Sequence, residues 1–166
     1  MPKLRYVISL LVVLILQTTF LSRFPVMETT PSLFLVYLVA LSILYGSKWG
    51  GYTGIGLGLL EDIMFSNVLG VHALVYFLCA SFVGRVLYHN QNQLATGTVM
   101  TVVVSFASFL GNGLILWLLG QATTTLWMLG TPLLYFALIN AILYPVVMLV
   151  LRRALKPERE RRFNPF

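Results

Sequence analysis

The chain has 166 residues, of which 58% are hydrophobic and only 10% are charged, and its mean hydropathy is +0.88. A soluble domain of this length cannot bury so much apolar surface, so the composition indicates an integral membrane protein. The net charge of +6 comes largely from a basic tail, because six of the eleven Lys and Arg residues lie in 152–166, directly after an apolar run. A basic tail in this place is typical of a topology determinant that contacts anionic lipids, and it argues against nucleic-acid binding.

Six apolar segments follow one another with short connections, and each is expected to form a membrane-spanning helix. The first begins like a signal peptide, but no small-x-small cleavage pattern follows it, so it is expected to be retained. The second has fourteen residues, which predicts a helix that is tilted, shielded by protein or extended by its flanks. Pro31 suits its first turn and Ser32 can cap it. The expected spans are 6–22, 32–45, 49–65, 71–88, 95–119 and 132–151.

The basic residues predict the orientation of the chain. With a cytoplasmic N-terminus and six alternating helices, ten of the eleven Lys and Arg residues lie on the cytoplasmic side and only Arg23 lies outside. The expected architecture is therefore an all-α polytopic membrane domain, 1–157, followed by a short basic cytoplasmic tail, 158–166. The residues expected to set topology or to contact lipid are Lys48, Arg85, Arg152, Arg153 and Lys156.

The third apolar segment is rich in glycine and ends on two carboxylates. On a helical wheel Gly51, Gly54, Gly58, Glu61 and Asp62 fall within an arc of roughly 100°. Small residues on one face of a membrane helix let a second backbone approach closely. This face is therefore expected to meet protein rather than lipid, either inside this chain or on a partner helix.

The expected depth of Asp62 in the membrane relates this face to the next apolar segment. Asp62 lies about 21 Å along a helix from Lys48, and His72 lies about 20 Å from Arg85, whereas the hydrocarbon core is about 30 Å thick. Asp62 and His72 are thus expected at similar depth on neighbouring helices. An ionisable group below the membrane surface is by default a functional hypothesis. Three alternatives stay open: a structural lock with His72 or Arg23 as the partner, carboxylates that face outer water, and a ligand, ion or proton site.

The fifth segment carries a second polar stripe, within about 80° of the helical wheel. It is expected to be a buried helix–helix face, with the lining of a cavity as the alternative. The stripe consists of Gly97, Thr101, Ser105, Ser108 and Asn112. In the last segment Asn140 and Tyr144 are one turn apart, and Pro145 is expected to kink the helix.

Known catalytic patterns do not fit this sequence. It contains no His-Glu-x-x-His motif, no Gly-x-Ser-x-Gly elbow and no P-loop, and its one cysteine, Cys79, can form neither an internal disulfide nor a cysteine zinc site. The sequence therefore predicts no enzyme, no metal site and no cofactor.

Several of these residues together resemble the MreD family of rod shape-determining membrane proteins. They are the GxxxGxxxD pattern of Gly54, Gly58 and Asp62, the LGVHAL run at 69–74 and the pair Gly84–Arg85. Pro31 before the second span, the spacing of Asn140 and Pro145, and the short basic tail support the resemblance. The chain departs from the family at Ser32, where an acidic or amide residue is common, and at Glu61, where an apolar residue is usual. The second departure favours Asp62 over Glu61 as the site residue.

The resemblance implies a non-enzymatic part of the bacterial elongation machinery in the cytoplasmic membrane. The expected partners are the transmembrane helix of MreC, then MreB, RodA and a class B penicillin-binding protein in sidewall peptidoglycan synthesis. It also implies a fold similar to the substrate-binding subunits of energy-coupling-factor vitamin transporters, and a small-molecule binding subunit is therefore the alternative function. The residues expected to serve helix packing or partner binding are Pro31, Gly51, Gly54, Gly58, Asp62 and His72.

Overall fold

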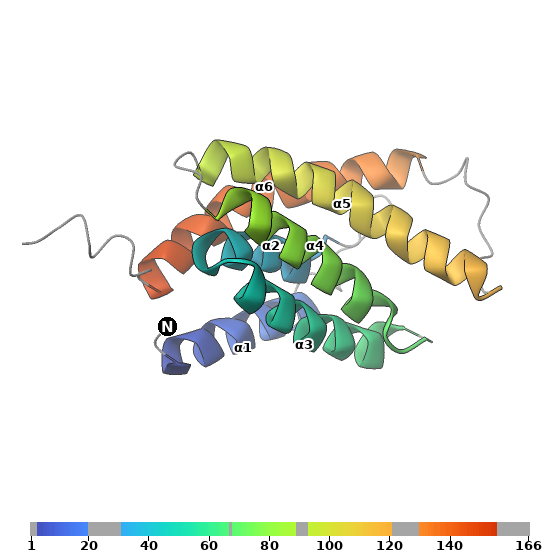
Figure 1. Cartoon of the computed structure of the whole chain (residues 1–166), viewed down its shortest axis with the longest axis horizontal. Coiled ribbons are helices and arrows are strands. Elements are labelled where there is room, and N and C mark those ends of the chain that lie inside the picture. The colour runs from blue at the N-terminus through green and yellow to red at the C-terminus, as the bar shows by residue number, and fades with distance from the viewer. Residues whose placement is uncertain (1–2, 20–30, 67, 89–92, 121–129, 156–166) are drawn as a thin grey trace, which may run out of the picture.

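The computed structural model describes residues 3–19, 31–66, 68–88, 93–120 and 130–155, and within them every regular element is a helix (Figure 1). This confirms the all-helical class, and one helix matches each of the six expected segments. The helices are α1 (Lys3–Thr19), α2 (Leu33–Tyr45), α3 (Ser47–Phe65), α4 (Val71–Leu87), α5 (Gln93–Leu118) and α6 (Gly130–Leu155).

Two helices are by themselves long and apolar enough to cross a bilayer. They cover Leu94–Leu118 in α5 and Pro132–Leu155 in α6, whereas Leu4–Thr19, Leu33–Tyr45 and Val71–Leu87 are shorter apolar helices. Apolar side chains are widely exposed on the outer faces of the bundle. A soluble protein of this size does not expose so much apolar surface, so the structure agrees with a membrane protein.

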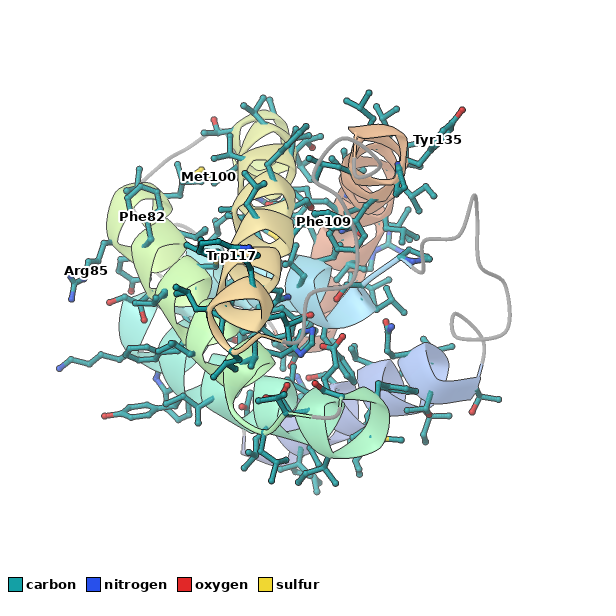
Figure 2. The ribbon with its side chains drawn as sticks, turned by 90° about the vertical axis from the view of Figure 1, so that its right-hand side faces the viewer. Phe82, Arg85, Met100, Phe109, Trp117 and Tyr135 are labelled. Atoms are coloured by element: carbon teal, nitrogen blue, oxygen red, sulfur yellow. The ribbon has the colours of Figure 1, made fainter. Side chains whose placement is uncertain are left out.

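Helix α2 lies at the centre of the bundle. All its residues from Leu33 to Leu44 are buried, and it contacts each of the five other helices. Figure 2, which views the bundle from the end where α3 and α4 are joined, shows α2 enclosed by its neighbours. A helix that is apolar on all sides is expected in such a place. The shortness of this segment is thus explained by shielding within the protein.

The start of α2 differs in one detail from the expectation. Ser32 is the N-cap, and its side chain accepts a hydrogen bond from the Leu35 N–H at 3.2 Å. Pro31 precedes the cap, so its expected place in the first helical turn was wrong. The Pro31 carbonyl instead accepts a hydrogen bond from Gln17 Nε2 at 3.2 Å.

The remaining helices form two antiparallel pairs and a single outer helix. The α3–α4 pair and the α5–α6 pair both pack on α2, and α1 contacts α2 and α6. Figure 1 shows α1 and α3 on one side of α2, and α5 and α6 on the other. Gly46 joins α2 to α3 with a φ of 86°, a left-handed conformation that glycine adopts without strain.

Candidate functional site

The glycines of α3 face α4. A methyl group added at Gly54 would lie 2.9 Å from the Tyr76 carbonyl oxygen, and one added at Gly58 would overlap the backbone of Ala73. A methyl group added at Gly51 would instead meet side chains of the same helix, Ser81 at 2.7 Å and Phe77 at 3.1 Å. Glycine at positions 54 and 58 therefore allows two membrane helices to touch backbone to backbone. Helix α4 occupies this face of α3, which leaves no room there for a helix of another protein.

Asp62 caps the N-terminus of α4. Its side chain is fully buried; Oδ2 accepts hydrogen bonds from the N–H groups of Gly70 and Ala73 at 2.8 and 3.3 Å, and Oδ1 accepts one from the His72 N–H at 3.2 Å. The first N–H groups of a helix have no partner inside the helix and carry a partial positive charge. Gly70, the N-cap residue of α4, has no side chain that can serve them. A carboxylate from the neighbouring helix therefore serves in its place.

The imidazole of His72 completes this arrangement. His72 Nδ1 lies 2.7 Å from Asp62 Oδ1, and the His72 side chain is 23% exposed. Because an ionised carboxylate can only accept hydrogen bonds, Nδ1 carries the proton. The two residues that the depth argument placed side by side are thus in direct contact. With four donors on two oxygens, Asp62 ties the end of α3 to the beginning of α4.

Glu61 belongs to a different set of contacts. Its carboxyl is hydrogen-bonded to the hydroxyl of Tyr76, which is itself 2.9 Å from Ser32 Oγ. Glu61 Oε2 is buried and has no hydrogen-bond partner among the described residues. Glu61 therefore connects α3, through Tyr76, to the N-cap of α2, and it shares no hydrogen bond with Asp62.

The N-terminus of α2 is the centre of a second polar network. Asn140 Oδ1 accepts a hydrogen bond from the Ser32 N–H, and Asn140 Nδ2 donates to Ser105 Oγ, both at 3.1 Å. From α1, Gln17 Oε1 accepts a hydrogen bond from the Leu33 N–H at 2.7 Å. Side chains of α1, α4 and α6 thus converge on the first residues of α2, and α5 joins them through the bond between Ser105 and Asn140. These bonds satisfy backbone groups that lipid cannot serve.

The polar stripe of α5 faces inward along most of its length. Thr101, Ser105 and Ser108 are buried, and a methyl group added at Gly97 would overlap the Tyr144 hydroxyl of α6. The hydroxyls of Thr101 and Ser108 donate to carbonyls of their own helix at 2.8 and 3.1 Å. Asn112 is half-buried, and its Oδ1 has no partner within the part of the chain that the structure describes.

Described basic side chains gather at the opposite end of the bundle. Lys48 begins α3, Arg85 ends α4, and Arg152 and Arg153 end α6. These helix ends are adjacent, because Gly84 touches Ser47 and the Tyr45 hydroxyl donates to the Leu155 carbonyl at 3.2 Å. Figure 2 shows Arg85 pointing away from the bundle. Lys156, Arg23 and the tail 158–166 lie outside the described residues.

Two members of these networks were missed by sequence reasoning. Gln17 is a single amide in an otherwise apolar run, and a polar residue in a membrane segment is a usable signal. Tyr76 offers no such signal, because an aromatic side chain in an apolar segment is ordinary. Neither network forms a metal centre, since no group of three His, Cys, Asp or Glu among the described residues can hold an ion.

Comparison with known proteins supplies the identity. A family model described as rod shape-determining protein MreD matches residues 3–154, nearly the whole chain. No curated protein and no solved structure gave a match. The matched region covers the described helices except for the last residue of α6, and it includes the glycine face of α3, Asp62 and the polar network around α2. The chain belongs to the MreD family of rod shape-determining proteins.

Proposed function

We propose that this protein is a non-enzymatic membrane scaffold of the bacterial cell-elongation machinery. The observation that carries the proposal is the family match along residues 3–154, which implies a role in rod shape determination. In this role the protein supports sidewall peptidoglycan synthesis by packing its helices against MreC and other elongation proteins. The hydrogen bonds of Asp62 support a scaffold, since all of them hold helices together.

The proposed arrangement has six helices across the cytoplasmic membrane and both termini in the cytoplasm. It is supported by the gathering of Lys48, Arg85, Arg152 and Arg153 at one end of the bundle, as the positive-inside rule requires. At that end the basic side chains contact anionic lipid headgroups. The short helix α2 needs no lipid contact of its own, because its neighbours enclose it.

The surface for a partner helix lies on the outside of the bundle. Since α4 covers the glycine face of α3, the transmembrane helix of MreC binds an outward apolar face instead. MreB, RodA and a class B penicillin-binding protein belong to the same complex in this proposal. Asp62 and His72 then support partner binding indirectly, by fixing the position of α4 relative to α3.

A cross-linking experiment tests this proposal. With Cys79 replaced by serine, single cysteines at Leu11, Leu59, Leu114 and Ile142 sample exposed positions on four helices. We expect one or two of them to cross-link to MreC in cells that keep their rod shape, whereas cysteine at buried Leu57 gives no cross-link. Failure of the protein both to co-purify with MreC and to support rod shape would contradict the scaffold function.

The transporter-subunit alternative is not favoured by any observation on this chain. Of the polar side chains of α5 that were candidates to line a ligand cavity, Ser105 accepts a hydrogen bond from Asn140, and Thr101 and Ser108 donate to carbonyls of their own helix. The proposed likeness to substrate-binding subunits of energy-coupling-factor transporters rests on the resemblance alone. Native mass spectrometry separates the two functions, since a stoichiometric bound metabolite favours the transporter subunit and bound MreC favours the scaffold.

A further inference from the structure

The two helix pairs of the bundle differ in length. Helix α3 has 19 residues and α4 has 17, whereas α5 and α6 have 26 each. At 1.5 Å per residue, α3 is about 28 Å long and α5 about 39 Å. Figure 1 shows α5 continuing past the turn that joins α3 to α4. With a hydrocarbon core of about 30 Å and the usual tilt, α5 and α6 are long enough to cross the bilayer fully, whereas α3 and α4 are shorter than the core is thick.

Exposed aromatic side chains mark where each pair meets the membrane–water interface. At the basic end, Trp49 and Tyr52 are exposed beside Lys48. At the other end, Trp117 of α5 and Tyr135 of α6 are exposed, and Figure 2 shows Tyr135 pointing outward. Tryptophan and tyrosine favour the headgroup level, so Trp49 and Tyr52 mark the inner interface on α3, and Trp117 and Tyr135 mark the outer interface on the α5–α6 pair.

The turn between α3 and α4 has no such marker. Among the described residues beside this turn, the exposed large side chains are apolar: Ile63, Met64, Phe65 and Leu69 have exposed fractions of 63%, 47%, 54% and 68%. No exposed Lys, Arg, Trp or Tyr accompanies them within residues 63–66 and 68–70. The charge pattern of the hairpin thus fits a basic end at the inner headgroups and an apolar end within acyl chains.

We propose that the α3–α4 hairpin ends inside the outer leaflet, so that the exposed apolar side chains beside its turn contact lipid acyl chains. The inference rests on the topology proposed above, with the basic helix ends at the inner surface, and refines it: α3 and α4 enter the outer leaflet without reaching its headgroups. Asp62 lies about 21 Å along α3 from Lys48, so its contact with His72 is below the level of the outer headgroups. At that depth no water competes for the bonds of Asp62 with α4, which explains why this carboxylate is saturated with donors.

Spin labels measure the depth of the turn directly. The full chain, with Cys79→Ser, is labelled at single cysteines replacing Met64 or Leu69 and reconstituted in phosphatidylcholine vesicles. Collision rates of the label with oxygen, which concentrates in hydrocarbon, are compared with those of a water-soluble nickel complex. We expect the oxygen-to-nickel ratio at both positions to be several-fold higher than at Lys48→Cys and to approach that of Val103→Cys in α5.

The controls separate this inference from the proposed function. If the Met64 and Leu69 labels collide mainly with nickel while Val103 reports hydrocarbon and Lys48 reports water, the turn is in water and the inference is overturned alone. If the Lys48 label itself reports hydrocarbon, the proposed membrane arrangement is wrong, and the inference fails with it. Vesicles with longer acyl chains give a second check, because the ratio at Met64 must rise as the bilayer thickens.

Discussion

At the scale of single residues, Asp62 is the most heavily bonded polar side chain that the structure describes. It accepts hydrogen bonds from three backbone N–H groups and one imidazole, and all of these donors belong to residues 70–73. Hydrogen bonds to a charged group are stronger than neutral ones, and a buried donor that loses its acceptor is costly. Asp62 therefore has a far larger effect on stability than its neighbour Glu61, one of whose oxygens has no described partner.

Substitutions at these two acids are expected to differ in a graded way. Asp62→Ala leaves three backbone N–H groups of α4 without an acceptor and should destabilise the protein by about 3 kcal/mol or more. Asp62→Asn keeps one acceptor oxygen and should therefore lower the free energy of unfolding by less than Asp62→Ala does. Glu61→Gln keeps an acceptor for Tyr76 and should change the free energy of unfolding least. Thermal unfolding in detergent measures this order. Equal loss for Glu61→Gln and Asp62→Ala would contradict the assignment.

Asn140 is the residue through which α2, α5 and α6 are joined. Asn140→Ala removes the acceptor of the Ser32 N–H and the donor to Ser105, whereas Ser105→Ala removes only one bond. Interhelical hydrogen bonds in membranes contribute about 0.6 kcal/mol on average. We expect a double-mutant cycle between Asn140 and Ser105 to give a coupling near that value, with Asn140→Ala the more destabilising single change. A coupling of zero would show that the bond is absent in the membrane.

At the scale of elements, the contact of α3 with α4 depends on where each glycine points. Gly58 faces the Ala73 backbone, whereas no atom lies within 4 Å of a methyl group added at Gly56. Both positions are in the same helix, so the cost of glycine as a helix residue is similar at both. A difference in stability between substitutions at Gly58 and at Gly56 therefore measures the effect of the close approach of the two backbones.

Alanine at these two positions tests that approach. Gly58→Ala forces the backbones apart and should destabilise the protein by about 1–3 kcal/mol, whereas Gly56→Ala should be neutral or slightly stabilising. Thermal unfolding checks stability, and co-purification with MreC checks function. Loss of MreC binding by Gly58→Ala with unchanged stability would place the partner on the glycine face after all.

At the scale of the whole molecule, the gathering of basic residues at one end of the bundle predicts how the chain is oriented in the membrane. Single cysteines at Lys48, Arg85 and Arg153, in a Cys79→Ser background, should react with a membrane-impermeant maleimide in inverted vesicles and be protected in intact spheroplasts, because the positive-inside rule keeps them cytoplasmic. Cysteine at Leu119, directly after α5, should behave in the opposite way. Labelling of Lys48 and Leu119 from the same side would contradict the six-span arrangement.

Much of the fold could be predicted from the sequence, because each membrane helix is recognised from its own run of apolar residues. Apolar runs of sufficient length and the residues between them predicted six helices, and the ends agree with the structure to within a few residues, as for 71–88 against Val71–Leu87. The second segment left three alternatives open, because length alone cannot tell a tilted helix from a shielded one. Only the packing of five helices around α2 decides between them.

The candidate site was predictable only where its members share one helix or one hairpin. Helical spacing placed Gly54, Gly58 and Asp62 on one face, and a depth argument brought His72 beside Asp62. The contacts of Gln17, Tyr76 and Asn140 with the start of α2 join residues that are far apart in the chain. No local pattern records which helix lies next to which, so these contacts were not predicted.

By itself, the sequence determined that this is an all-helical membrane protein with a one-sided basic charge, because hydrophobicity, helical periodicity and charge act locally along the chain. The resemblance carried by Gly54, Gly58, Asp62 and the run at 69–74 led to the family that the comparison confirms. Tertiary structure alone decided that the glycine face meets α4 and that Asp62 caps α4. Those outcomes depend on how closely two backbones approach, which is settled only when the helices pack.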